Sequence, residues 1–407
     1  MPRSFATLIA AQFCSALADN ALLIVGVALL IERGLPAWWA PMLKFSFTIA
    51  YVVLAPFVGA WADAARKAYV MLAMNTLKVV GVIALLAGVH PLLALAVVGI
   101  GAAGYAPAKY GLVTELVPPA GLVAANGWIE VSTVCAAVFG VVLGGLFVTP
   151  LFLSAAQAVW PHGASAGLLP LLLLYALAAG LNLGIPDSGA RYPHNRVALV
   201  PMLRGFAAAQ RTLWKDRDGA LSMGITTLFW GAAAVLQFAV LQWAAERLQL
   251  GLDRAAWLQG VVALGIVAGA AWAGRVFTLH GARRALPLGI AMGLAVPMAA
   301  QAGSVFSAMA SMALVGVLGG ALVVPLNALL QHRGHSLLSA GRSIAVQGFN
   351  ENLSVLAMLA VYAVLLASGV PVQTLMVVLG LVVGCGVAAL TWRDSWVRAQ
   401  PQPPQQA

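Results

Sequence analysis

A few ionisable side chains interrupt long apolar stretches of this 407-residue sequence. Asp19, Lys109, Glu130 and Glu351 each lie among apolar residues. An ionised side chain at the centre of a lipid bilayer costs about 2.5–3.5 kcal/mol on insertion scales, so such groups usually face a polar cavity or pair with one another. A carboxylate attracts an ammonium group or carries a proton, and a lysine attracts a phosphate as a point charge. The four residues are therefore candidates for binding a charged ligand or for moving protons.

Asp19 belongs to a polar stripe. Gln12, Ser15 and Asp19 are spaced by three and four residues, which places them on one helical face. The stripe predicts a surface that faces a cavity, with Asp19 as a binding group. The alternative is a structural ion pair between Asp19 and a lysine of another helix, either Lys78 or Lys109.

Lys109 follows Pro107, where a helix is prone to kink and to free a backbone carbonyl. At this position the lysine is a candidate partner for a phosphate group. Two other roles remain open: an ion pair with Glu115, or a side chain that extends to the membrane surface to keep its charge in water.

The composition places these residues in a membrane protein. Of the 407 residues, 62% are apolar and 8% are charged, and the mean hydropathy is +0.94. A soluble domain carries about 25% charged residues, which excludes a water-soluble globule. The apolar residues form continuous runs rather than the alternating segments of about 10 residues that build a porin-type barrel.

Twelve apolar segments approach the length of about 20 residues that crosses the hydrocarbon core. They predict an all-α membrane protein with twelve transmembrane helices in two pseudo-symmetric six-helix bundles. The predicted spans are 6–31, 41–61, 69–89, 92–113, 124–149, 168–186, 219–245, 257–278, 285–302, 305–330, 343–367 and 372–392. The predicted domains are an N-terminal bundle (1–186), a cytoplasmic linker (187–218), a C-terminal bundle (219–392) and a cytoplasmic tail (393–407).

The formal net charge of +10 indicates membrane topology rather than nucleic-acid binding. Most of the 22 basic residues fall in connections on one side of the predicted membrane. The positive-inside rule places that side in the cytoplasm, together with the linker and both termini. We therefore expect a multi-pass protein of the bacterial inner membrane that contacts membrane lipids and has no nucleic-acid partner.

The linker contains a segment that begins at Pro201 and has an apolar helical face formed by Met202, Phe206 and Leu213. Its basic residues lie elsewhere around the helix: Arg204, Arg211 and Lys215. Such a helix can lie on an anionic leaflet, and a basic linker that only sets topology is an equally good interpretation.

The two halves of the chain repeat one another weakly, with an offset of about 220 residues. The equivalent pairs are Glu130 with Glu351, Lys109 with Asn327, and Asp19 with Gln237. The recurrence of the two glutamates favours a shared packing or gating role over direct ligand contact. Two repeated six-helix halves are typical of major facilitator transporters, which bind substrate between the halves near the membrane midplane.

The segment from Gly59 to Lys67 strengthens that resemblance. It is similar to the major facilitator signature Gly-x-x-x-Asp-Arg-x-Gly-Arg-Arg and keeps the glycine, Asp63 and the basic end, Arg66 and Lys67. The resemblance implies the major facilitator fold and a gating role for these three charged residues, as a cytoplasmic latch. The equivalent loop of the second half, near Arg283 and Arg284, lacks the acid.

Several further runs resemble the bacterial lysophospholipid transporter (LplT) family over nearly the whole chain. They are Gln12-Phe13, Asp19 to Leu23, Ala55 to Gly59, Tyr105 to Gly111 with Glu115, Ala125 to Gly127, Leu228 to Gly231, Val324 to Gln331, and Ile344 to Gln347 with Glu351-Asn352. The resemblance implies a flippase that moves lysophosphatidylethanolamine or lysophosphatidylglycerol to the cytoplasmic leaflet by alternating access. There a partner acyltransferase that uses acyl carrier protein would reacylate the product. No cofactor is implied.

The resemblance also implies that Asp19 and Lys109 contact the lipid headgroup. The remaining candidates for the substrate site are Asn20, Glu130, Gln237, Asn327 and Glu351. Two positions depart from the family. Gln237 stands where a basic residue is expected, and Arg342 stands where an uncharged residue is expected.

Three other functions are weighed against this one. A proton-coupled major facilitator exporter of drugs or metabolites would use the same buried carboxylates as proton carriers. A lipid-modifying enzyme is disfavoured, because none of the six histidines has an aspartate five positions later and no Gly-x-Ser-x-Gly elbow stands in a strand–helix context. The third is a scaffold for an acyltransferase without transport of its own. The three scattered cysteines predict neither a disulfide framework nor a metal site.

Overall fold

The computed structural model describes the whole chain except residues 1–2, 36–38, 157–162, 190–198, 251 and 400–407. The regular structure of the described residues is helical throughout. The longer helices are α1 (Arg3–Glu32), α2 (Trp39–Val53), α3 (Ala55–Ala64), α4 (Lys67–Leu86), α5 (Pro91–Leu116), α6 (Leu122–Phe147), α8 (Leu168–Leu183), α9 (Leu199–Lys215), α10 (Arg217–Leu248), α11 (Leu252–Val276), α12 (Leu286–Ala300), α13 (Val305–Leu337), α14 (Ala340–Ala367) and α15 (Val372–Ala399). The short ones are η1 (Pro119–Gly121), α7 (Pro150–Ala156), η2 (Gly163–Gly167) and η3 (Ala282–Ala285).

These helices confirm the predicted class of fold. Within the described residues, ten helices are long and apolar enough to cross a membrane, and α2 with α3 forms an eleventh span that is bent by 54°. The bend falls at Leu54, just before Pro56, whose ring cannot donate the backbone hydrogen bond that would continue the helix. The ninth predicted span coincides with α12, which has 15 residues and is about 22 Å long at 1.5 Å per residue.

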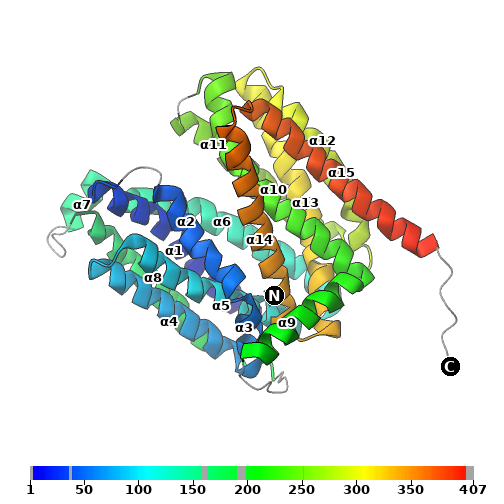
Figure 1. The fold of residues 1–407 in the computed structure, drawn as a ribbon. Helices are drawn as coiled ribbons and strands as arrows, with labels where there is room; N and C mark the ends of the chain where they lie inside the picture. Colours follow the sequence, from blue (N-terminus) through cyan, green and yellow to red (C-terminus); the bar gives the residue numbers. More distant parts are fainter. Residues whose placement is uncertain (1–2, 36–38, 157–162, 190–198, 251, 400–407) are drawn as a thin grey trace.

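The chain folds into two sets of helices on either side of a central contact. Figure 1 shows α1 to α8 mostly on the left and α10 to α15 on the right. Between the sets, α14 packs against α3 and α5, and α6 packs against α11 and α13. The predicted tail (393–407) lies partly in α15 and partly outside the described residues, and part of the linker also lies outside them.

Close packing within the second set depends on small residues. A Cβ atom added to Gly265 of α11 would lie 3.0 Å from the Cα of Gly316 on α13. A Cβ atom added to Gly316 would likewise lie 3.0 Å from the Cα of Gly265. Helices in a membrane gain little from hydrophobic burial between them, so close backbone approach and van der Waals contact stabilise the pair.

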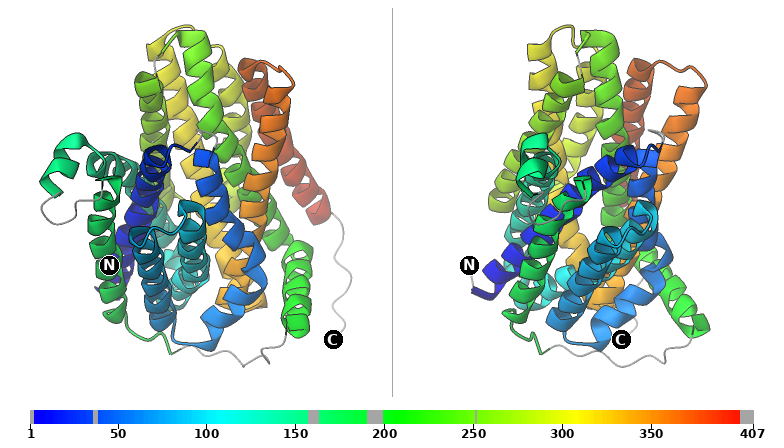
Figure 2. Two further views of the ribbon diagram at one scale, coloured as in Figure 1. Left: turned by 60° about the vertical axis from the view of Figure 1, so that its left-hand side comes forward. Right: turned by 90° about the vertical axis from the view of Figure 1, so that its left-hand side faces the viewer.

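Helix α9 lies at one end of the bundle, and we call this the α9 end. It contacts α3 of the first set and α10, α13 and α14 of the second. In both views of Figure 2 the helix sits on the outside of the bundle rather than between spanning helices. The linker therefore bridges the two sets where α3 ends and α14 begins.

Candidate functional site

Asp19 forms an ion pair with Lys78, a residue of the neighbouring helix α4. The Lys78 ammonium donates to the two carboxylate oxygens of Asp19 at 2.9 and 2.7 Å, and the Tyr175 hydroxyl donates to Oδ1 at 2.7 Å. The Lys78 side chain is 2% exposed and the Asp19 side chain is 17% exposed. The structural ion pair, one of the two interpretations of Asp19, is thus present, and the carboxylate remains the accessible member.

The polar stripe of α1 continues this network. Ser15 donates to the Asn75 side-chain oxygen at 2.8 Å and accepts a hydrogen bond from Lys78 at 2.9 Å. An ammonium has three donors, and Asp19 and Ser15 together provide acceptors for all of them. Lys78 therefore has no donor left for a ligand. Tyr175 on α8 was not identified from the sequence, because nothing in its spacing connects it with α1.

Lys109 is held differently. Its ammonium donates to Oε1 of Gln12 at 3.1 Å and lies 4.1 Å from the centre of the Tyr110 ring. Gln12 in turn donates to hydroxyl groups on α6, Ser132 at 3.0 Å and Thr133 at 3.2 Å. Among the described residues Gln12 is the one hydrogen-bond acceptor of Lys109, so two ammonium donors remain for a ligand.

The two alternatives for Lys109 do not fit this geometry. Glu115 pairs with Lys67 at 2.7 Å instead. The Lys109 residue is 8% exposed, so it does not extend to the surface. Glu130, on α6, is 4% exposed and interacts electrostatically with Lys109. Lys109 is therefore a buried cation between Glu130 and the polar stripe of α1.

A cavity of about 190 Å³ lies between the two sets of helices beside Lys109. Across it, Gln347 on α14 donates to the side-chain oxygen of Asn327 at 3.0 Å and to Glu351 at 2.8 Å. One wall thus carries a cation and the other a carboxylate. The cavity is lined by Tyr51, Ala55, Val58, Ala103, Ala106, Pro107, Lys109, Tyr110, Trp230, Asn327, Ile344, Ala345, Gln347, Gly348, Glu351 and Asn352.

The other predicted substrate-site residues lie outside this lining. The Asn20 amide donates to the carbonyl of Ala16 at 2.8 Å. Gln237 is exposed, and its backbone carbonyl accepts a hydrogen bond from the Gln259 side chain. Asp19 and Glu130 lie behind Lys109 rather than on the cavity wall. The structure thus brings Lys109, Asn327 and Glu351 together, and it does not bring Asn20 or Gln237 to them.

Asp63 joins the two sets at the α9 end. It accepts hydrogen bonds from the Ser339 hydroxyl and, at 2.9 Å, from the Gly341 backbone N–H. Ser339 precedes the first residue of α14 and makes no side-chain cap of its own. A carboxylate at a helix N-terminus is favourable because backbone N–H groups there lack partners and carry a partial positive charge. Asp63 therefore caps a helix of the opposite set and stabilises the contact between the two sets at this end.

The basic residues of the same segment have separate roles. Lys67 lies 3.7 Å from Asp63 and forms the 2.7 Å ion pair with Glu115, within the first set. Arg66 donates to the carbonyl of Ile185 at 3.2 Å and lies over the Tyr69 ring at 4.9 Å. Asp63 makes polar contacts across the two sets, whereas the contacts of Arg66 and Lys67 given above lie within the first set.

A second contact between the sets was missed from the sequence. Asn126 on α6 and Gln331 on α13 exchange two side-chain hydrogen bonds, each 2.9 Å long, and both residues are buried. The two amides are far apart in the chain, so only their positions in space reveal the pair. Reciprocal amide bonds in a buried site satisfy both groups without charge.

In the second half, Arg283 pairs with acids that come from other helices of the same set. Arg283 pairs with Asp218 at the start of α10 and, at 2.9 Å, with Asp394 of α15. Nearby, Arg333 donates to Asp216 at 2.5 and 3.1 Å. Burial opposes ionisation of Asp216, but the hydrogen bonds from Arg333 and the Gly219 N–H hold the pKa of Asp216 below its ordinary value. The loop near Arg283 thus lacks an acid of its own, but Asp218 and Asp394 of other helices pair with its arginine.

Gly59 sits at the tightest point between α3 and α14. A Cβ atom added there would lie 2.9 Å from three atoms of α14: the Cα of Arg342, the carbonyl oxygen of Gly341 and the Cβ of Ala345. Overpacking of this kind typically costs about 1–3 kcal/mol. We therefore expect Gly59→Val to push α3 and α14 apart and to favour opening of the α9 end by roughly 5- to 150-fold.

Spin labels on the exposed residues Ala64 and Ser336, in a protein with the native cysteines replaced by serine, measure this opening as a longer interlabel distance. Gly180→Val is the matched control, because a Cβ atom there meets nothing within 4 Å. An unchanged distance distribution in Gly59→Val would contradict the role given to this contact.

Comparison with known proteins agrees with the fold. A sequence model of the Major Facilitator Superfamily matches residues 8–354. A "Lysophospholipid transporter LplT" of Cronobacter sakazakii is 40% identical over 394 residues, 96% of each chain, and one of Yersinia enterocolitica is 39% identical over 375 residues, 91% of this chain and 89% of the relative.

Solved structures share the fold at low sequence identity. A bacterial homologue of the iron transporter ferroportin, in an outward-facing state, superposes with a TM-score of 0.73 at 15% identity, covering 97% of this chain and 99% of that one. The transporter FucP, in an outward conformation, gives 0.72 at 17% identity, covering 98% and 99%. The protein is thus a multi-pass membrane transporter, and the chain belongs to the LplT family of the Major Facilitator Superfamily.

Proposed function

We propose that this protein moves lysophospholipids, such as lysophosphatidylethanolamine and lysophosphatidylglycerol, across the bacterial inner membrane to its cytoplasmic leaflet. The observation that carries the proposal is the cavity between the two sets of helices, with the two unused donors of Lys109 on one wall and Glu351 on the other. A zwitterionic headgroup has the complementary charges. The names of the relatives that match nearly the whole chain support the same substrate class.

The headgroup binds by its two charges. Its phosphate takes the free donors of Lys109, and its ammonium lies near Glu351 on the facing wall. Asp19, the accessible carboxylate of the ion pair, acts on the headgroup electrostatically from behind Lys109. Asn327 and Gln347 supply amide groups for the glycerol. Glu130 supports the charge of Lys109 from behind the cavity. The acyl chain stays in the lipid, because the cavity has room for a headgroup alone.

The transport cycle follows from the contacts at the α9 end. We assign the α9 end to the cytoplasm by the positive-inside rule. The bundles 1–186 and 219–392 on either side of the linker have six predicted spans each, and an even number of spans returns the chain to the same side. Both termini therefore lie in the cytoplasm as well. Asp63, Gly59 and the Asn126–Gln331 pair hold the cytoplasmic end closed. Opening this end while the other end closes releases the lysophospholipid inward, where an acyltransferase that uses acyl carrier protein reacylates it.

Uptake by purified protein in proteoliposomes tests the substrate and the role of Lys109. Lys109→Ala is expected to lower the rate of labelled lysophosphatidylethanolamine movement by roughly 10- to 150-fold, because a hydrogen bond to a charged group contributes about 1.5–3 kcal/mol. Asp19→Ala is expected to reduce it as well. Arg247→Ala, at an exposed position outside the cavity, is the control and retains the wild-type rate.

Two outcomes contradict the proposal. Unchanged uptake in both Asp19→Ala and Lys109→Ala, at equal amounts of reconstituted protein, removes the headgroup assignment. A flux of dyes that follows a pH gradient, with no lipid movement, favours the proton-coupled exporter instead. The observation that keeps this second function open is a pair of carboxylates, the buried Glu130 and the half-buried Glu351, which interact electrostatically across the two sets.

A further inference from the structure

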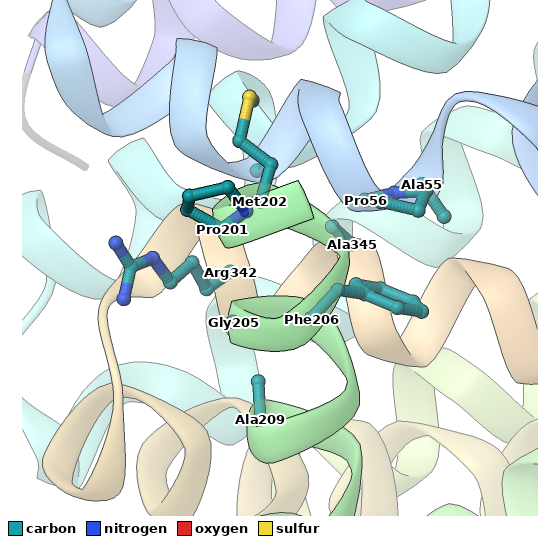
Figure 3. Close-up of a pocket in the computed structure, with 10 residues that line it drawn as sticks. Ala55, Pro56, Pro201, Met202, Gly205, Phe206, Ala209, Arg342 and Ala345 are labelled. Atoms are coloured by element: carbon teal, nitrogen blue, oxygen red, sulfur yellow. The ribbon is translucent and has the colours of Figure 1, made fainter. Parts of the chain in front are cut away.

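Helix α9 has one face fixed against the protein. Leu213 is fully buried and Ala209 is 4% exposed, and both pack in a cluster with Met223, Leu330 and Val346. Phe206 makes an edge contact with Phe349, with ring centres 5.4 Å apart. Figure 3 shows that this face of α9 points toward α3 and α14, where the three helices line a small pocket of about 30 Å³. These contacts fix the rotation of the helix and therefore determine which residues point outward.

The outward face combines large apolar side chains with basic ones. Val200, Leu203 and Trp214 are 53%, 44% and 37% exposed. The basic residues Arg204, Arg211 and Lys215 are also exposed. At 100° per residue these six positions fall within a sector of about 120°, with the apolar residues along one edge and the basic residues along the other. The helix contains no acidic residue.

The position of α9 sets the depth of this face. Lys215 is the last residue of α9, and the next residue, Asp216, caps the spanning helix α10 by accepting the Gly219 N–H at 2.9 Å. The end of a spanning helix lies at the boundary between lipid and water. Because α9 lies on the outside of the bundle (Figure 2), next to the end of a spanning helix, its exposed face is open to the lipid headgroups at this end.

We propose that the outer face of α9 is a binding site for anionic phospholipid in the cytoplasmic leaflet. Leu203, Trp214 and Val200 enter the boundary of the acyl region, and the basic edge contacts lipid phosphates. A helix with basic residues beside apolar and tryptophan side chains has the composition of one that lies in a membrane surface. Anionic lipid complements both edges at once, because its phosphate meets the charges and its acyl chain meets the apolar row. This site is separate from the transport cavity and does not depend on the proposed substrate.

Quenching of Trp214 by brominated lipid tests the proposal in the full-length protein. The protein is placed in nanodiscs with a fixed ratio of phosphatidylglycerol to phosphatidylcholine, and bromine is carried on the acyl chains of one lipid or of the other. The difference between wild type and Trp214→Phe isolates the emission of this residue from that of the other tryptophans. We expect brominated phosphatidylglycerol to quench Trp214 about twice as strongly as brominated phosphatidylcholine, because basic residues enrich the anionic lipid near them.

The basic edge is tested by replacing Arg204, Arg211 and Lys215 together with glutamine. In this variant both brominated lipids are expected to quench Trp214 equally. Arg211→Gln alone should lose part of the preference, and it serves as a second test if the triple variant does not reconstitute. Arg247→Gln, a charge removal at an exposed site outside α9, is expected to keep the full preference.

Two results overturn the proposal. Trp214 emission that is quenched by aqueous acrylamide but by neither brominated lipid places the face in water. Equal quenching by the two brominated lipids in the wild-type protein shows no selection for the anionic headgroup.

Discussion

Lys78→Met is expected to destabilise the protein by about 3–5 kcal/mol, the range observed when one partner of a buried ion pair is removed. The Lys78 side chain is 2% exposed, and its ammonium donates a hydrogen bond to each of the two carboxylate oxygens of Asp19. Without it, Asp19 keeps the Tyr175 hydroxyl as a donor but loses its counter-charge. The measurement is the shift in thermal unfolding of purified protein, followed by tryptophan fluorescence.

The double variant Asp19→Asn, Lys78→Met distinguishes a charge effect from a packing effect. Removing both charges is expected to recover most of the stability, because no uncompensated ion remains in the buried site. Lys215→Met is the matched control, since that lysine is exposed on α9. A double variant as unstable as Lys78→Met would show that the lysine stem, rather than the ion pair, stabilises this region.

Asp63→Ala is expected to open the α9 end. The carboxylate accepts hydrogen bonds from Ser339 and Gly341 of the opposite set, and a hydrogen bond to a charged group contributes about 1.5–3 kcal/mol. Loss of even one of these two bonds should therefore shift the closed-to-open ratio by roughly 10- to 150-fold toward open. Spin labels at Ala64 and Ser336 report the change as a longer distance across the two sets.

Asp218→Asn is the control for this experiment. Asp218 also pairs with a basic residue, Arg283, but both belong to the second set, so its loss is expected to leave the distance between the sets unchanged. Asp63→Asn should fall between wild type and Asp63→Ala, because an amide oxygen still accepts a hydrogen bond without the charge that favours a helix N-terminus. A wild-type distance in Asp63→Ala would mean that Gly59 and the Asn126–Gln331 pair suffice for closure.

The helical architecture could be predicted because each span carries its own signal. A run of about 20 apolar residues must form a helix in lipid, where every backbone polar group needs an internal partner. The break between α2 and α3 also has a local cause in the sequence, because Pro56 interrupts the backbone hydrogen bonds there. The weak repeat of two six-helix halves, typical of major facilitator transporters, predicted a site between the halves, and Lys109, Asn327 and Glu351 line one cavity there.

Other parts of the site could not be predicted from spacing. Gln237 was chosen as the repeat equivalent of Asp19, yet it is exposed and away from the cavity. A weak repeat relates positions along the chain, but the tilt and rotation of each helix decide which side chains reach the centre. The acids that pair with Arg283 were missed for a similar reason, since Asp218 and Asp394 belong to helices distant in sequence.

The sequence by itself determined that this is a polytopic helical protein and that a few ionisable residues lie within its apolar spans. These properties depend on composition and on residues close together in the chain. Only the tertiary structure decided the partners: Lys78 beside Asp19, Gln12 beside Lys109, and the start of α14 beside Asp63. A hydrogen bond or ion pair is effective over a few ångströms, so its partners are set by how helices pack and not by their order.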